Sequence, residues 1–434
     1  MPAPSLTRRA ILAQAWPIML GQATVPLVGI VDTAVIGRTG DATALAAVAL
    51  GTTIVNFLFW AFGFLRMGMT GLTAQASGAG DGAEMAALLR RGLILGGAVG
   101  AALFVLQLAI VPAALALMAG GGSLDQATRA YVTARLFGAP AALAFYAANG
   151  WLLGLGRTRA ALGIQLILNL ANVALTTWFV WALGWGVRGV GLATAAADWI
   201  AVVAALGVTR SGWRGEAARL FDRAALARLF AVNRDLMIRT LALLALFAWF
   251  TNAGARLGAE TLAAQQVLMQ FVAVSAFVLD GFCFTAEARV GAAIGARDRA
   301  GMLRAVRLVG EFCLGTAAAF ALTIAIGGEA FVALLTTSTQ VRAVAAGLLP
   351  LVAIVPLIGT PAWLLDGVFI GATAGRALRN AALLSTAAYV ATDLALRPLG
   401  ASGVWLALLL GYAWRALALG LYWRGLLRRL SPSP

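Results

Sequence analysis

The chain has 434 residues, of which 62% are hydrophobic and only 11% are charged, and its mean hydropathy is +0.90. Soluble globular proteins do not reach this composition, which excludes them and indicates a protein that crosses the lipid bilayer many times. The formal net charge of +15 comes from arginine alone, because the sequence contains no lysine.

Apolar stretches long enough to cross about 30 Å of hydrocarbon as helices recur along the whole chain. Short turns rich in Gly, Arg, Asp or Pro separate them. The pattern predicts an all-α polytopic membrane protein with twelve transmembrane helices. These spans are expected at residues 11–37, 44–77, 92–118, 130–155, 160–184, 189–209, 236–256, 262–292, 306–335, 343–372, 380–396 and 403–423.

The arginines are distributed unevenly between the loops on the two sides of the membrane. With the N-terminus in the cytoplasm, 23 of the 32 arginines fall in cytoplasmic loops and ends and 7, including Arg135, in the opposite loops. Arginine and lysine accumulate on the cytoplasmic side of membrane proteins, so both termini are expected there. The same rule accounts for the basic charge without a nucleic-acid partner. The other two arginines, Arg66 and Arg415, fall inside predicted spans.

The two halves of the sequence resemble each other when the chain is shifted by 217 residues, half its length. Residues 45–47 then fall on 262–264, the turn at 78–81 falls on 295–298, and Asn149-Gly150 falls on Asp366-Gly367. Each half contains six spans, so we expect two six-helix lobes related by a pseudo-twofold axis along the membrane normal. The expected domains are an N-terminal lobe at 1–209, a cytoplasmic linker at 210–235 and a C-terminal lobe at 236–434.

Ionisable groups inside the predicted spans are functional candidates, because each costs about 2.5–3.5 kcal/mol to insert. Asp32 falls in the outer part of span 1, and Asn172 and Thr176 of span 5 and Asp198 of span 6 fall at comparable depths. The sequence therefore predicts that these side chains converge in one polar band of the N-terminal lobe. A static hydrogen-bonding role for either aspartate is the alternative.

A carboxyl group in hydrocarbon can act as a reversible proton carrier when its protonation changes the shape of the helix around it. Pro17 and Pro26 lie on the same predicted helix as Asp32. Each proline leaves a backbone carbonyl without its helical partner and permits bending. We therefore expect protonation of Asp32 to be read out as a change in the shape of span 1.

Arg66 aligns with Cys283 in the internal repeat, and two acids, Asp280 and Glu287, flank that position on span 8. If spans 2 and 8 face each other, either acid lies within reach of the guanidinium group. One hypothesis is that Arg66 bridges the lobes as a cytoplasmic-side latch of the outward-open state. The alternative is that Arg66 pairs within its own lobe or extends to the cytoplasmic surface.

Aromatic and methionine side chains accompany these charges on spans 2 and 8. They can line an adaptable apolar substrate cavity, although helix packing and lipid contact are the more common roles of such residues. The residues concerned are Phe57, Trp60, Met67 and Phe284.

No pattern in the sequence predicts an enzyme, a metal site or a cofactor. The chain has no histidine, and Cys283 and Cys313 fall in separate spans. The Gly-x-Gly-Asp run at 78–81 resembles that of intramembrane aspartyl proteases, but it ends a span and recurs at 295–298. It is therefore interpreted as a structural turn.

Taken together, these residues resemble the multidrug and toxic compound extrusion (MATE) transporters, in particular their DinF-type branch. The resemblance is carried by "WPIMLGQATVPLVGIVDTAVIGRTG" in span 1, "LFWAFGFLRMGMTGLTAQ" in span 2, "GLGRTR" after span 4 and "LDGFCFTAEARVGAAIGARD" at the end of span 8. It implies cation-coupled antiport of lipophilic, often cationic small molecules by rocking alternating access. The location implied is the bacterial inner membrane, where we expect a monomer that contacts the lipid bilayer.

The resemblance also implies roles for individual residues. Asp32 would couple protons to the bending of span 1, and Asp366 in span 10 would match an acid that some members carry in the second lobe. Members often carry an aspartate after the run "NLAN", which holds Asn169 and Asn172, where this chain has Thr176. That departure leaves Asp198 as the second acid of the N-terminal lobe. The resemblance implies H⁺ as the coupling ion, because DinF-like members tend to use protons, with Na⁺ left open.

Two other functions fit the same pattern of spans. A lipid-linked oligosaccharide flippase of the same superfamily is the nearest alternative to a multidrug antiporter. A passive channel is a further alternative, because channels also line their pores with polar groups.

Overall fold

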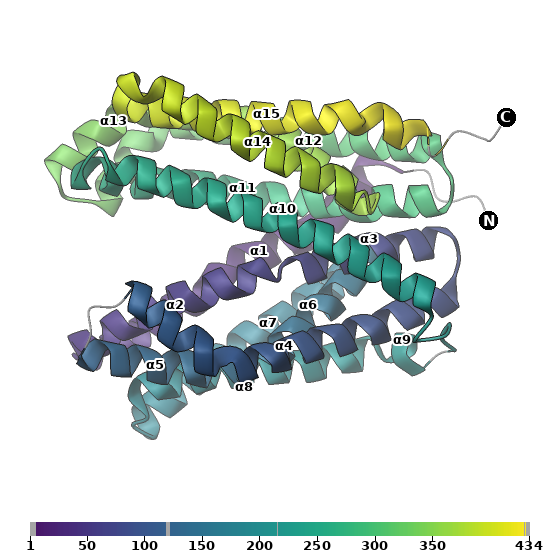
Figure 1. The fold of residues 1–434 in the computed structure, drawn as a ribbon, viewed down its shortest axis with the longest axis horizontal. Coiled ribbons are helices and arrows are strands. Elements are labelled where there is room, and N and C mark those ends of the chain that lie inside the picture. Colours follow the sequence, from purple (N-terminus) through teal and green to yellow (C-terminus); the bar gives the residue numbers. More distant parts are fainter. Residues whose placement is uncertain (1–5, 119–121, 215, 429, 431–434) are drawn as a thin grey trace. The chain divides into compact units, whose positions relative to one another are not determined.

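The computed structural model describes residues 6–118, 122–214, 216–428 and 430, and nearly all of them are helical. Figure 1 shows long helices joined by short turns. In chain order the elements are α1 (Arg8–Gly37), α2 (Ala42–Ala61), α3 (Phe64–Gly78), α4 (Gly82–Met118), α5 (Ser123–Leu136), α6 (Ala139–Gly154), α7 (Thr158–Thr177), the π-helix η1 (Trp178–Ala182), α8 (Gly186–Val208), α9 (Arg210–Arg214), α10 (Arg223–Ala255), α11 (Ala259–Gly295), α12 (Arg299–Leu335), α13 (Thr339–Gly371), α14 (Gly375–Leu396), the 3₁₀-helix η2 (Arg397–Leu399) and α15 (Gly400–Arg428).

The helices account for twelve membrane spans. In the described part of the chain, ten helical stretches are long and apolar enough to cross a bilayer, and α5 with α6 forms one more span, bent by 48°. One of the ten stretches, Gly375–Arg428, contains two helices, α14 and α15, which fold back on each other at η2 and pack side by side (Figure 1). The all-α architecture with twelve spans is thus confirmed.

The chain forms two compact units. Unit 1 contains the N-terminal residues up to Met19 and the chain from Ala227 onward, and unit 2 contains Leu20–Leu226. Helix α1 therefore contributes to both units and passes from one to the other between Pro17 and Pro26. The lobe boundaries expected from the sequence stay a prediction.

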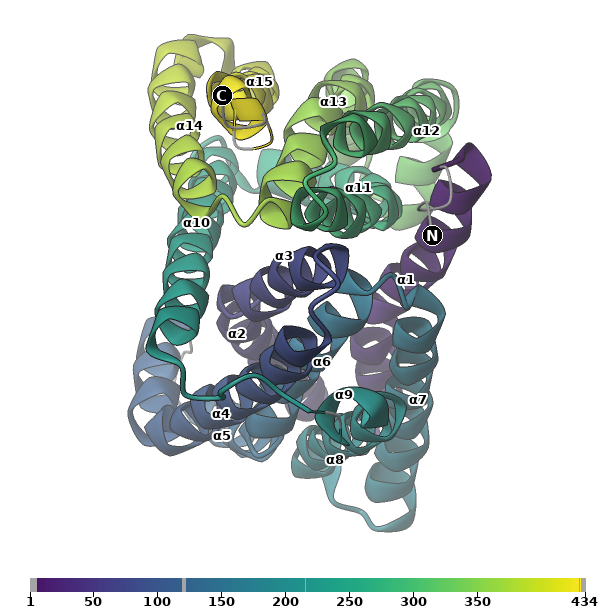
Figure 2. The same ribbon diagram turned by 90° about the vertical axis from the view of Figure 1, so that its right-hand side faces the viewer.

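A close helix crossing occurs in each unit at equivalent positions of the repeat. In unit 2, a Cβ atom at Gly150 of α6 would lie 2.3 Å from the carbonyl oxygen of Arg66 on α3. In unit 1, a Cβ atom at Gly367 of α13 would lie 2.6 Å from the carbonyl oxygen of Cys283 on α11. Glycine permits both backbones to approach this closely. The paired helices, α3 with α6 and α11 with α13, can be followed in Figure 2.

The turns at 78–81 and 295–298 also match each other in detail. Gly80 and Arg297 occupy the same place in the two turns and both have positive φ, +71° and +55°. The next residue in each turn, Asp81 or Asp298, accepts a hydrogen bond from the backbone amide three residues later, at 2.8 and 2.7 Å. Both aspartates therefore cap helices, which is the structural role that the repeat indicated.

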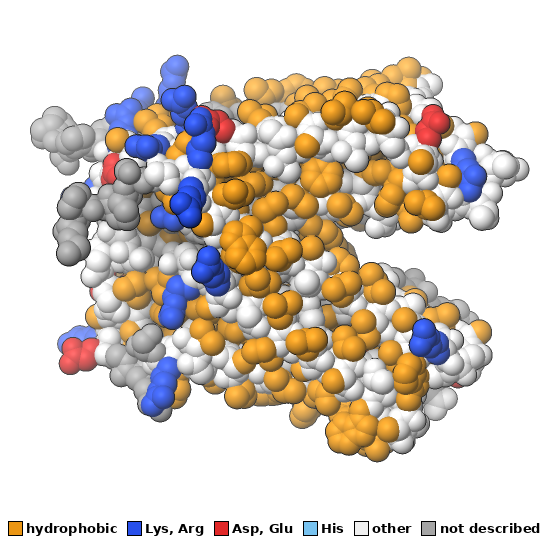
Figure 3. All heavy atoms as spheres, turned by 180° about the vertical axis from the view of Figure 1, so that it is seen from behind, with side chains coloured by type: hydrophobic (Ala, Val, Ile, Leu, Met, Phe, Trp, Pro, Cys, Tyr) orange, Lys and Arg blue, Asp and Glu red, His pale blue; other side chains and the backbone are white. Residues whose placement is uncertain are grey.

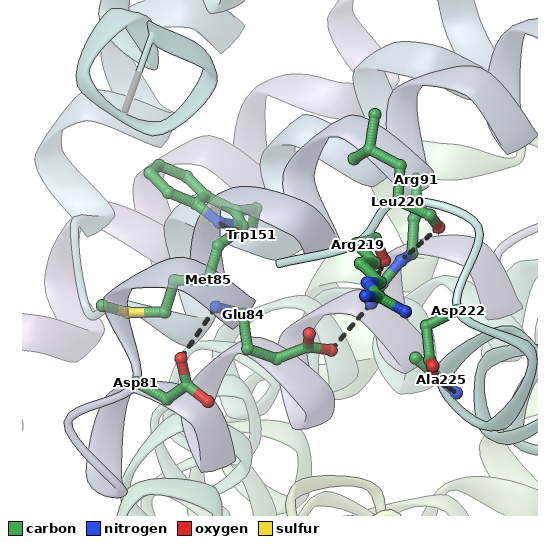
Figure 4. A network of polar contacts seen from close by, with 9 residues as sticks. All are labelled: Asp81, Glu84, Met85, Arg91, Trp151, Arg219, Leu220, Asp222 and Ala225. Atoms are coloured by element: carbon green, nitrogen blue, oxygen red, sulfur yellow. Dashed lines mark hydrogen bonds and ion pairs between the residues drawn. The ribbon is translucent and has the colours of Figure 1, made fainter. Parts of the chain in front are cut away.

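The distribution of side chains on the surface fits a membrane protein. On the face shown in Figure 3, most arginine side chains gather near one end and hydrophobic side chains cover much of the rest. In unit 2, the buried guanidinium group of Arg91 on α4 donates to Glu84 at 2.8 Å. It also donates to the backbone carbonyls of Arg219 and Leu220, at 2.6 and 2.8 Å (Figure 4). These contacts attach the segment after α9 to unit 2.

The expected linker is partly helical. Helix α10 begins at Arg223, well before residue 236, where the sequence pattern placed the start of span 7. Asp222 caps this helix by accepting a hydrogen bond from the amide of Ala225 at 2.8 Å (Figure 4). The polar residues that suggested a linker therefore extend a transmembrane helix beyond its apolar part.

Candidate ion-coupling site

Asp32 on α1 lies buried inside unit 2, with 2% of its surface exposed. The hydroxyl group of Thr176 on α7 donates to its Oδ1 at 3.1 Å, and that of Thr194 on α8 donates to its Oδ2 at 3.2 Å. The amide of Asn172 on α7 also donates to Oδ1, at 3.4 Å. The carboxyl group is therefore held by three neutral side chains, and we call these four residues the Asp32 site.

The chemistry of the Asp32 site suits a carboxyl group in either protonation state. A hydroxyl group can donate to a carboxylate or, after rotation, accept from a carboxylic acid. The Oδ1 atom of Asn172 has no hydrogen-bond partner among the described residues. It lies buried and supplies a further acceptor beside Asp32. The Asp32 carboxyl group can therefore gain or lose a proton and still have hydrogen-bond partners in its buried position.

The spacing of the polar residues on α7 explains why they meet Asp32. Asn172 and Thr176 are four residues apart and share one face of the helix. The sequence analysis placed both near Asp32 from their depth in the membrane. Thr194 was missed. The sequence feature that could have identified Thr194 is its position four residues before Asp198, among the small residues of α8 that allow close packing.

Asn169 lies one turn before Asn172 on α7 and contacts the backbone of α1. Its side-chain amide donates to the carbonyl oxygen of Thr24 at 3.2 Å, and its own oxygen accepts from Gln165 at 3.1 Å. Thr24 is two residues before Pro26, where the helix lacks a backbone donor. Asn169 therefore holds α1 beside one of its two expected bending positions.

Asp198 forms an ion pair with an arginine of α5. Its Oδ2 accepts a hydrogen bond from Nη1 of Arg135 on α5 at 2.5 Å, and both side chains are buried. The guanidinium carbon also lies 5.0 Å from the centre of the Phe59 ring. The sequence analysis had assigned Arg135 to an outer loop and gave it no role. The structure places it inside unit 2, within electrostatic range of Asp32.

The second-lobe acid, Asp366 on α13, lies in unit 1 between two arginines. Its Oδ2 accepts from Nη2 of Arg239 on α10 at 2.5 Å and forms an ion pair with Arg415 on α15. All three side chains are buried. We call this group the Asp366 cluster. These ion pairs connect helices α10, α13 and α15 inside unit 1.

The remaining predicted residues are distributed over both units. Phe57 and Trp60 are exposed on α2, Met67 lies on α3, and Phe284 is buried on α11. Their roles in a substrate cavity stay a prediction.

The residues of the predicted latch also belong to different units. Arg66 lies on α3 of unit 2, and Asp280 and Glu287 lie on α11 of unit 1, where both are within electrostatic range of Arg239. The latch hypothesis therefore stays a prediction. Within the described ranges, no group of three or more His, Cys, Asp or Glu side chains is arranged to hold a metal ion.

Fold and site together define a polytopic helical membrane protein with a buried carboxyl group surrounded by neutral hydrogen-bond donors. The sequence model of the MatE family matches residues 17–178 and 236–391. The two matched segments reproduce the internal repeat. The chain belongs to the MatE family, which is a family of transporters and not of enzymes.

Individual relatives agree with this assignment. The chain is 37% identical over 405 residues to DNA damage-inducible protein F of Escherichia coli (strain K12), which covers 92% of this chain and 88% of that protein. It is 30% identical over 366 residues to the probable multidrug resistance protein NorM of Aromatoleum aromaticum, covering 77% and 74%. The crystal structure of the Vibrio cholerae MATE transporter VcmN in the bent form has the same fold. It superposes with a TM-score of 0.89 at 19% identity and covers 98% of this chain and 97% of that one.

Proposed function

We propose that this protein is a proton-coupled antiporter that exports lipophilic, often cationic compounds, with Asp32 as the residue that carries the coupling proton. The observation that carries this proposal is the burial of the Asp32 carboxyl group among neutral donors. A buried ionisable group without a counter-ion in hydrogen-bond contact changes charge state more readily than one held in an ion pair. The relatives named for multidrug resistance support the class of substrate.

In the proposed cycle, protonation of Asp32 changes the hydrogen bonds between α1 and helices α7 and α8. The helix then adopts a different shape at Pro17 and Pro26, where its backbone hydrogen bonding is interrupted. Because α1 contributes to both units, its shape can bias the equilibrium between two arrangements of the transporter. Release of the proton returns the helix to its first shape.

The remaining parts of the proposal concern position in the cell and the path of the substrate. The arginine distribution supports an inner-membrane protein with both termini in the cytoplasm and no nucleic-acid partner. We further propose that the protein acts as a monomer. The aromatic residues of α2 and α11 are proposed to contact the substrate, and Arg66 is proposed as the cytoplasmic-side latch.

The test is transport by purified protein in proteoliposomes loaded with ethidium as the probe. An imposed pH gradient is expected to drive uphill ethidium export by the parent protein and not by Asp32→Asn. Glu260→Gln, which changes an exposed acid at the start of α11, serves as the matched control and is expected to keep parent activity.

Three outcomes would contradict the proposal. Uphill export that persists in folded Asp32→Asn would remove Asp32 from the coupling step. Absence of ethidium export by the parent, together with movement of a lipid-linked oligosaccharide in the same vesicles, would favour the flippase function instead. Ethidium movement that only follows its own gradient would indicate a passive channel.

A further inference from the structure

Unit 2 contains a second buried carboxylate, Asp198, which the hydrogen bonds of the Asp32 site do not use. Asp198 on α8 reaches Arg135 on α5 because the helical structure is interrupted between α5 and α6, at Gly138. A Cβ atom at Gly138 would lie 2.9 Å from Oδ2 of Asp198 and 2.7 Å from the Cα atom of Ala195. The absence of a side chain there allows α8 to approach closely, and the ion pair forms at 2.5 Å.

The guanidinium group of the ion pair acts electrostatically on the Asp32 site. Arg135 lies within electrostatic range of both Asp32 and Asp198, and so does the hydroxyl group of Tyr131, one turn before Arg135 on α5. That hydroxyl group shares a hydrogen bond with Thr52 of α2 at 3.0 Å. The titratable and charged groups around the two carboxyl groups are Tyr131, Arg135 and Tyr146.

We propose that Arg135 determines the choice of coupling cation by holding Asp198 in an ion pair, so that the Asp32 site accepts H⁺ and excludes Na⁺. This inference rests on the proposed function of Asp32 as the coupling residue. It assigns a specificity-determining role to a residue that is not itself part of the hydrogen-bonded site.

The physical reason is the different demand that the two cations make on their surroundings. A proton binds covalently to one carboxyl oxygen. A hard metal cation must replace its hydration shell with several oxygen ligands, and the negative charge of the site sets how strongly it binds. The Asp32 site supplies oxygens from one carboxylate, two threonines and Asn172. Arg135 engages the second carboxylate, Asp198.

Charge acts in the same direction. With both acids ionised, Asp32, Asp198 and Arg135 carry a net charge of −1, whereas the two acids without the arginine carry −2. Charge interactions are strong in a buried site because the local dielectric constant is low. Removing the guanidinium charge therefore increases the negative potential that attracts Na⁺ to the Asp32 site.

The experiment replaces the guanidinium group and measures the response to Na⁺. Proteoliposomes with equal pH on both sides receive an inward Na⁺ gradient, with choline as the control cation, and ethidium export is measured. The parent is expected to show no Na⁺-driven export, and Arg135→Met is expected to gain about tenfold or more over its choline control. Arg135→Lys keeps the positive charge and is expected to behave as the parent.

A double variant separates the role of Asp198 from a general loosening of the fold. Arg135→Met with Asp198→Asn removes the second carboxylate and is expected to lose the Na⁺ response. Arg135→Gln can still donate to Asp198 and replaces the methionine variant should that variant not fold.

Several outcomes overturn the inference. Na⁺-driven export by the parent would show that Arg135 does not exclude Na⁺. A folded Arg135→Met or Arg135→Gln protein that stays insensitive to Na⁺ would also overturn the assignment, and so would a double variant that keeps the response. Failure of the parent to respond to a pH gradient would instead reject the proposed function.

Discussion

The Asp32 site of unit 2 and the Asp366 cluster of unit 1 bury the same kind of side chain in opposite surroundings. Asp32 is hydrogen-bonded to two hydroxyl groups and an amide, whereas Asp366 lies between two guanidinium groups. Both carboxyl groups are almost completely removed from solvent. Burial alone therefore does not decide whether an acid serves as a switch or as a fixed charge.

The two sites differ in the charge of the side chains that contact the carboxyl group. Two buried arginines contact the Asp366 carboxyl group, and loss of its charge would leave them uncompensated in a medium of low dielectric constant. The neutral partners of Asp32 can satisfy either of its protonation states. Five substitutions test this comparison and the repeated helix crossing through the free energy of unfolding in detergent micelles.

The largest effect is expected for Asp366→Asn. This change leaves two buried guanidinium groups without their carboxylate, and we expect a loss of about 3–5 kcal/mol. Chemical unfolding followed by circular dichroism measures the loss. Adding Arg239→Gln should recover part of it, and a single variant as stable as the parent would show that the Asp366 cluster is not a structural ion pair.

Intermediate losses are expected when the glycine of either close crossing becomes alanine. Gly150→Ala and Gly367→Ala each force a methyl group against a backbone carbonyl, at 2.3 and 2.6 Å, so we expect about 1–3 kcal/mol in each case. Gly163→Ala and Gly420→Ala are matched helical controls with no atom within 4 Å of the added carbon, and they should not destabilise the protein. Equal behaviour of all four variants would reject the repeated crossing.

A smaller loss is expected for Thr176→Val, which keeps the shape of the side chain and removes one donor to Asp32. We expect about 1–2 kcal/mol, because a buried hydrogen bond to the carboxyl group disappears. Thr176→Ser retains the hydroxyl group and should stay near the parent. If serine and valine are equally destabilising, packing rather than the hydrogen bond explains the effect.

The smallest change in stability is expected for Asp32→Asn, less than about 1 kcal/mol, because an amide can keep hydrogen bonds to the same neighbours without a buried charge. Transport should nevertheless be lost. The pair Asp32→Asn and Asp366→Asn thus separates function from stability. A large destabilisation by Asp32→Asn would mean that Asp32, like Asp366, is a structural charge.

Much of the fold follows from the sequence. Hydropathy is a property of neighbouring residues, and the repeat can be read by comparing the two halves of the chain. The apolar stretches and the shift of 217 residues predicted twelve helices in two related halves. The start of α10 at Arg223 was missed because a helix can continue beyond its apolar part into polar residues. Hydropathy detects the membrane-embedded portion of a helix and not its full length.

The candidate site was only partly accessible to the same reasoning. Depth along each helix brought Asn172 and Thr176 to Asp32, since helical rise converts residue number into height. It did not reveal Arg135, which is 63 residues from Asp198 in sequence and lay at an uncertain span boundary. Helix rotation and close packing, here at Gly138, determine which of two acids at similar depth receives a counter-ion. The sequence pattern specifies neither of them.

The most direct test of the account is proton release on substrate binding. Ethidium is added to purified protein in weakly buffered detergent solution, and the pH change is recorded for the parent, Asp32→Asn and the control Glu260→Gln. The account predicts that the parent and the control release protons and that Asp32→Asn does not. Equal proton release by folded Asp32→Asn would contradict the central claim that the Asp32 carboxyl group carries the exchanged proton.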